Sequence, residues 1–90
     1  MLTLEKLKAY ESFGGDMDGH ARSAGKGKLV ITDADWYLID ELLMALDTVA
    51  SGMASAGFMQ RLERRMVESA ADPATRDALM ELAARRRGNP

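Results

Sequence analysis

The longest stretch with helical apolar periodicity runs from Ile31 to Ala56. Large apolar residues recur there at the three- and four-residue spacing that places side chains on one face of a helix. They are Trp36, Ile39, Leu43, Leu46, Ala50 and Met53, and a second set at Leu38, Leu42, Ala45 and Val49 widens the stripe. A helix with so wide an apolar stripe must be contacted on more than one side. We therefore predict a central helix, packed by other helices or by a second copy of the chain.

The start of this helix is well specified. Thr32 can cap it, because a Thr hydroxyl accepts a hydrogen bond from a first-turn amide that lacks a helical partner. Asp35 then falls at the third helical position, where its carboxylate can complete a capping box. Ile31 and Trp36 have the spacing of a hydrophobic staple. These signals predict a helix that begins at residue 33.

The end of the central helix is open to three interpretations. The helix stops at Gly52, or it stops at Gly57, or it continues past Gly52 with a bend. We prefer a break at Gly52, because Ser55 can then cap the next helix. Gly57 would also be a favourable terminal residue, since Phe58 would follow it against Met53.

Three further helices follow from periodicity and capping residues, and the predicted fold is all-α. The four main helices are expected at about 3–13, 33–51, 56–71 and 73–87, in a small bundle or orthogonal array within a single domain, 1–90. Asp72-Pro73 is a strong start for the last one, because Pro is favoured at a first helical position. The Gly-rich stretch from 14 to 30 is expected to hold a short helix that Asp16 caps and that runs through Arg22, and a flexible loop at about 24–28. A frayed tail is expected at 88–90.

Composition narrows the classes of protein. The 90 residues contain no Cys, so disulfides and Cys-ligated metals are excluded. No signal peptide or membrane span is visible, and we expect a soluble cytoplasmic protein. Charge is uneven: residues 1–31 carry five basic and four acidic groups, residues 32–57 carry five acidic and no basic groups, and residues 58–90 carry seven basic and five acidic groups. Opposite charge of this kind is typical of helices that pack against each other.

The sequence contains no complete catalytic or metal-binding pattern. The stretch GGDMDGH has two alternating Asp residues but lacks the downstream acidic ligand of a calcium loop. His20 has no partners that would form a catalytic triad. We therefore expect no enzyme activity, no metal, no cofactor and no small-molecule ligand.

The favoured function is a non-catalytic interaction or assembly domain that self-associates, because the central helix has more apolar surface than three short helices can be expected to cover. Its partner would be a second copy or another protein. The candidate interface residues are Trp36, Ile39, Leu43, Met53, Phe58 and Met59. The alternative is a helix-turn-helix protein that reads nucleic acid with a basic face of Gln60, Arg61, Arg64 and Arg65. The net charge of −2 argues against that alternative.

Overall fold

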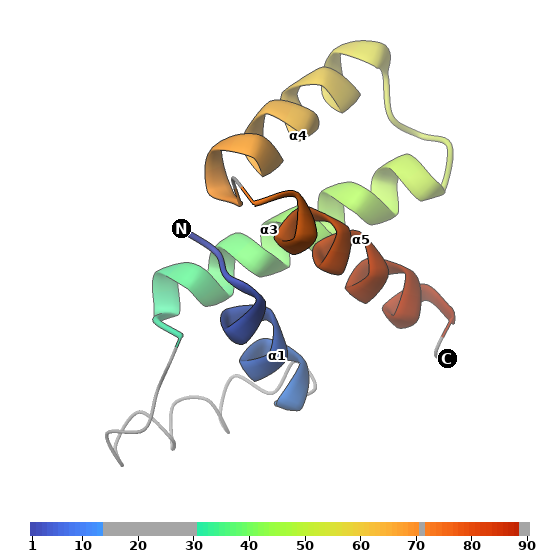
Figure 1. Ribbon diagram of the computed structural model, residues 1–90. Coiled ribbons are helices and arrows are strands. Elements are labelled where there is room, and N and C mark those ends of the chain that lie inside the picture. The colour runs from blue at the N-terminus through green and yellow to red at the C-terminus, as the bar shows by residue number, and fades with distance from the viewer. Residues whose placement is uncertain (14–30, 71, 89–90) are drawn as a thin grey trace.

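The computed structural model describes residues 1–13, 31–70 and 72–88, and in these ranges the chain is helical with no strand. The helices are α1 (Leu4–Ser12), α3 (Asp33–Ala50), α4 (Ala56–Ser69) and α5 (Pro73–Gly88) (Figure 1). The all-α prediction is confirmed, and each main helix begins and ends within two residues of its expected bounds. The short helix expected from Asp16 to Arg22, the loop at 24–28 and His20 lie outside the described residues.

The core is formed where α1 and α5 pack against α3. Trp36 is at its centre and is 2% exposed. Its ring lies 4.5 Å from the ring of Tyr10 and 5.9 Å from the ring of Phe13, centroid to centroid. Ile39 and Leu79 are fully buried in the same cluster. Burial of aromatic and branched side chains is the main favourable term in folding such a small domain.

Both ends of α3 follow the predicted signals. The Thr32 hydroxyl accepts a hydrogen bond from the Asp35 amide at 3.1 Å, and the Asp35 carboxylate accepts one from the Thr32 amide at 3.2 Å. The helix ends before Gly52, whose φ of 77° is left-handed. The Gly52 amide donates to the Val49 carbonyl and the next amide donates to the Thr48 carbonyl. This pair of bonds is the Schellman motif. The preferred break at Gly52 is confirmed.

Helix α4 turns back along α3 after a short connection (Figure 1). Ser55 caps it, as expected, by accepting a hydrogen bond from the Phe58 amide at 3.1 Å. Glu41, near the middle of α3, pairs with Arg65 in the second half of α4. Val49, near the end of α3, shares a groove with Met59, near the start of α4. The two helices therefore form an antiparallel αα-hairpin.

The end of α4 and the start of α5 are fixed by local hydrogen bonds. The Asp72 carboxylate accepts from the Ala74 amide at 2.9 Å, which confirms Asp72 as the capping residue before Pro73. The Arg76 guanidinium donates to the Ala70 carbonyl at 2.9 Å, and the Leu2 amide donates to the Ser69 carbonyl at 2.7 Å. These contacts set the point from which α4 and α5 diverge.

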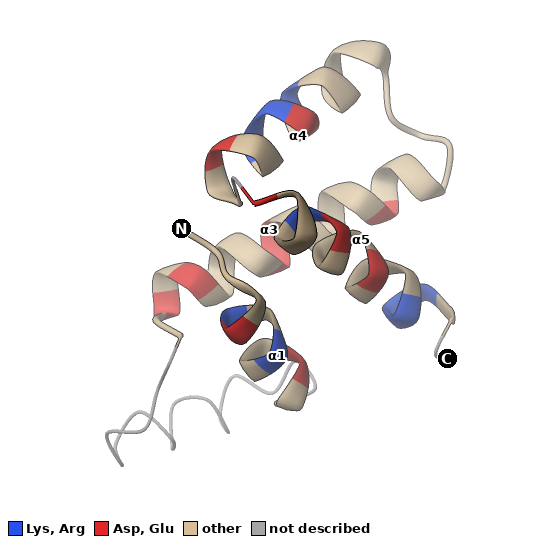
Figure 2. Ribbon diagram, in the orientation of Figure 1, with Lys and Arg blue, Asp and Glu red and all other residues tan. Residues whose placement is uncertain are grey.

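The uneven charge of the sequence corresponds to contacts between helices. Acidic residues follow α3, and basic residues lie on the helices around it (Figure 2). Among the described residues, three ion pairs join α3 to neighbouring helices: Lys6–Asp35 at 3.1 Å, Arg65–Glu41 at 2.8 Å and Arg87–Asp47 at 3.4 Å. The Arg65–Glu41 and Arg87–Asp47 pairs are exposed, and exposed ion pairs each contribute roughly 0–1 kcal/mol. They orient the helices more than they stabilise them, and they confirm the packing interpretation of the charge pattern.

Candidate interaction surface

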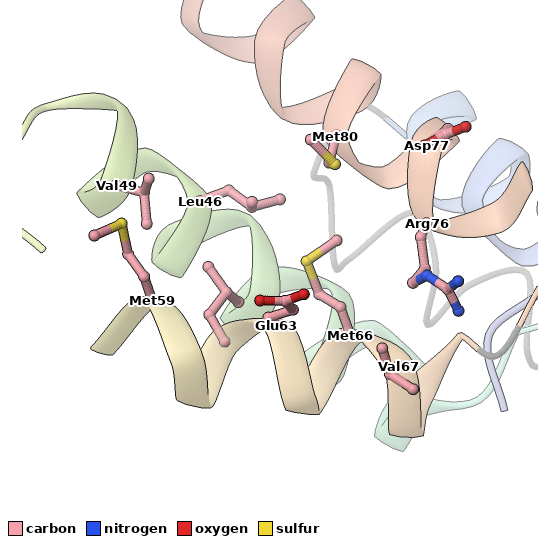
Figure 3. A pocket seen from close by; sticks show the side chains of 10 residues that line it. Leu46, Val49, Met59, Glu63, Met66, Val67, Arg76, Asp77 and Met80 are labelled. Atoms are coloured by element: carbon pink, nitrogen blue, oxygen red, sulfur yellow. The ribbon is translucent and has the colours of Figure 1, made fainter. Parts of the chain in front are cut away.

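An open groove of about 440 Å³ lies between α3, α4 and α5. Figure 3 shows its walls, with α4 on one side and α5 on the other, and with α3 behind them. Its lining is mostly apolar and includes three methionines. The lining residues are Leu46, Val49, Met59, Leu62, Glu63, Met66, Val67, Arg76, Asp77 and Met80. We call this surface the methionine groove.

The groove exists because α4 packs mainly on α3 and diverges from α5. Leu62 and Met66 belong to the core cluster and are 8% and 7% exposed. Met59 and Val67 lie at the edge of the same helix face and are 44% and 49% exposed. Met80, on the opposite wall, is 52% exposed. An apolar floor with half-exposed apolar walls is the form expected of a surface that takes up another apolar group.

The apolar surface continues along α3 towards its C-terminal end. A second hollow of about 270 Å³ shares Leu46, Val49 and Met80 with the methionine groove and adds Ala50, Ala83 and Arg87. The two hollows are therefore neighbouring parts of one surface. The second hollow lies between α3 and α5, so the surface extends along α3 beyond the part that α4 borders.

The charged residues that line the groove differ in the contacts they make. The Glu63 carboxylate lies between Met59 and Met66 in Figure 3, and it has no hydrogen bond or ion pair with any residue in the described part of the chain. Arg76 is held at the end of α4 through the Ala70 carbonyl. Asp77 lies on the rim, with its carboxylate directed away from the groove (Figure 3). Glu63 is thus the charge that faces the groove without a partner among the described residues.

The six predicted interface residues are distributed over different parts of the molecule. Trp36, Ile39 and Leu43 are at most 2% exposed and lie in the chain's own core, so they offer no surface to a partner. Met53 is 81% exposed in the connection before α4. Phe58 is half-buried on the other side of α4, and Met59 lies in the groove.

Sequence reasoning missed the α5 wall of the groove, including Met80. Met66 and Val67 on the α4 wall follow helical apolar spacing with Met59 and Leu62, and that spacing is the signal available from the sequence. No local pattern set Met80 apart from the buried residues of its helix, because its exposure depends on where α4 lies.

The four residues of the predicted nucleic-acid face, Gln60, Arg61, Arg64 and Arg65, are all exposed on α4. Arg65 is bonded to Glu41 at 2.8 and 3.1 Å, and Arg61 lines a hollow on that same side. Gln60 and Arg64 lie on the outer side of the helix beside Glu63 and Glu68. The nucleic-acid alternative therefore stays a prediction, although the bond between Arg65 and Glu41 takes one of its basic side chains.

The described residues also show what is present in the way of metal-binding groups and buried titratable pairs. They contain no group of three acidic or His side chains placed to hold a metal ion. Tyr10 donates a hydrogen bond to the Asp40 carboxylate inside the core, and burial, followed by the hydrogen bond and charge of Asp40, raises the pKa of Tyr10 to about 12. A phenol with so high a pKa stays protonated at neutral pH. We interpret the pair as structural.

Comparison with known proteins does not extend this picture. No protein-family model matches the sequence, and neither a curated protein nor a solved structure is significantly similar to it. None of the helices in the described ranges has the length and apolar character needed to cross a bilayer. The geometry of the methionine groove is therefore the basis for a functional proposal.

Proposed function

We propose that this protein is a non-catalytic helical interaction domain, and that its binding surface is the methionine groove. The observation that carries the proposal is the half-exposure of Met59, Val67 and Met80 around an apolar floor. Methionine is flexible and polarisable, so it adapts to different apolar shapes and is frequent on binding surfaces. Burial of these side chains by a partner would provide the driving force.

The mode of binding we propose is the docking of an amphipathic helix. A groove between two helices with a third as its floor accepts apolar side chains that repeat at helical spacing. The sequence favours self-association, in which a second copy would supply the helix. A helix of another protein would present the same kind of face. Both sources require the groove to be available on the surface.

Selection from a displayed library of amphipathic helical peptides tests the proposal. Met80→Asp places a charge in the groove wall. Met44→Asp is the matched control, because Met44 is 67% exposed on α3 and does not line the groove. Circular dichroism establishes that both variants remain folded. Sedimentation velocity of the protein alone measures self-association.

The expected result is a set of peptides that bind the wild type and Met44→Asp with Kd below roughly 100 μM and bind Met80→Asp at least tenfold more weakly. A dimer that Met80→Asp dissociates would also support the groove as the binding surface. A library that yields no binder, together with a monomer at all concentrations, would overturn the proposal. So would binding that Met80→Asp leaves unchanged.

A further inference from the structure

Glu63 is an acidic residue in the mostly apolar lining of the methionine groove. Its carboxylate lies between two methionines on the α4 wall and forms no ion pair with a described residue. Arg76, the cation that lines the same groove, donates to the Ala70 carbonyl instead. Covering the groove with a wholly apolar helix would remove water from this carboxylate without replacing its hydrogen bonds. Burying an unpaired charge in this way is costly. A partner that carries a positive group opposite Glu63 avoids the cost.

We propose that the occupant of the groove is an amphipathic helix of another protein with a Lys or Arg in the middle of its apolar face. This inference rests on the proposed function and specifies its partner. A helix of 14 residues, the length of α4, spans about 21 Å. Apolar side chains one turn apart on such a helix would contact Met59, Met66 and Met80. The basic side chain between them would meet Glu63 and form a charge-assisted hydrogen bond.

A second copy of this chain is the competing occupant, and the charge layout of α4 disfavours it. The exposed apolar residues of α4 are Met59 and Val67, four residues to either side of Glu63. In an antiparallel pair of α4 helices, the register that sets Met59 against Val67 of the second copy also sets the two Glu63 side chains against each other. Like charges opposed in an interface oppose association.

Charge reversal at Glu63 tests the inference. The same peptide library is selected against the wild type and against Glu63→Lys, and the selected pools are sequenced. Lys or Arg is expected at one central position in the first pool, and Asp or Glu at that position in the second. Glu68→Gln is the matched control, because Glu68 is an exposed acidic residue of α4 that does not line the groove.

Affinities of one selected peptide complete the test. Replacing its central Lys by Gln should weaken binding to the wild type and to Glu68→Gln about fivefold, and should leave binding to Glu63→Gln nearly unchanged. Equal affinity for all charge variants, with binding still lost in Met80→Asp, would overturn the inference and leave the interaction function standing. A dimer that Met80→Asp dissociates and Glu63→Gln tightens would identify a second copy as the occupant and also overturn it. Absence of any binding would remove both proposals.

Discussion

The substitution Tyr10→Phe removes one hydroxyl group from the interior of the protein and keeps the ring. The Tyr10 side chain is buried beside Trp36, and its hydroxyl donates a hydrogen bond to the Asp40 carboxylate. Burial is the largest cause of the change in acidity, followed by the hydrogen bond and the negative charge of Asp40, and together they raise the pKa of Tyr10 from 10.0 to about 12. The folded state therefore holds the neutral phenol more strongly than the unfolded chain does.

The sign of the effect follows from the direction of the pKa change. Because folding raises the pKa, the stabilisation is complete below pH 10 and is lost as the pH rises through about 12. Each unit of pKa difference is equivalent to about 1.4 kcal/mol, so about 1.4 kcal/mol is lost by pH 11 and about 2.7 kcal/mol above pH 12. Tyr10→Phe lacks this contribution. At neutral pH it lacks the hydrogen bond, which costs about 1.5 kcal/mol.

Urea unfolding followed by far-ultraviolet circular dichroism measures this difference. The wild type should exceed Tyr10→Phe in free energy of unfolding at pH 7, and the two proteins should become nearly equal at pH 11. Deprotonation of Lys and Arg affects both proteins alike and cancels in the comparison. Tyr37→Phe is the control, since Tyr37 is 62% exposed, and it should keep the wild-type pH dependence. Equal losses of stability in the wild type and in Tyr10→Phe would refute the reasoning.

Four other substitutions test the fold. Leu79→Ala should lower the free energy of unfolding by about 2–5 kcal/mol, because Leu79 is 0% exposed; a loss below 1 kcal/mol would contradict its place in the core. Asp35→Asn should cost about 1 kcal/mol at pH 7. Partial burial acts to raise the pKa of Asp35, but the hydrogen bonds from Lys6 and the helix cap outweigh it and lower the pKa. The difference in free energy of unfolding between the wild type and Asp35→Asn should therefore persist at pH 6 and vanish as the pH falls below 3.8. Gly52→Ala should destabilise the protein by about 1 kcal/mol, because Gly52 has a positive φ. Gly57→Ala should be neutral or stabilising, because Gly57 lies inside α4. Thermal melts that rank the two variants in the opposite order would show that the turn is misassigned.

The helix ends could be predicted from the sequence because their determinants are local. Thr32 and Asp35 lie three residues apart, and a hydroxyl and a carboxylate at that spacing satisfy the first amides of a helix in any tertiary context. Gly52 is recognisable for a similar reason, since a left-handed residue at a helix end is inexpensive only for glycine. Such signals fix where α3 begins and ends. They contain no information on which helix it meets.

Ion pairs between residues that are far apart in the sequence could not be predicted from the sequence. The natural partner for Arg85 is Glu81, one helical turn earlier, at a spacing that favours an ion pair. In the structure the Arg85 guanidinium instead bonds Glu11 of α1 with two hydrogen bonds, at 2.8 and 3.1 Å. The choice between the two carboxylates depends on the packing of α1 against α5. No spacing along the chain predicts that packing.

The same distinction explains where the exposed apolar surface lies. The breadth of the apolar stripe on α3 suggested a surplus at Trp36 and Leu43, but α1 and α5 cover that part of the helix. The apolar surface that stays exposed lies further along, where α4 covers one side of α3 and leaves its own edge open at Met59 and Val67. A periodicity count measures how much apolar surface a helix has, and the paths of the neighbouring helices decide which part reaches solvent. For that reason Met80, which no local pattern distinguished, is the residue whose substitution tests the proposed function most directly.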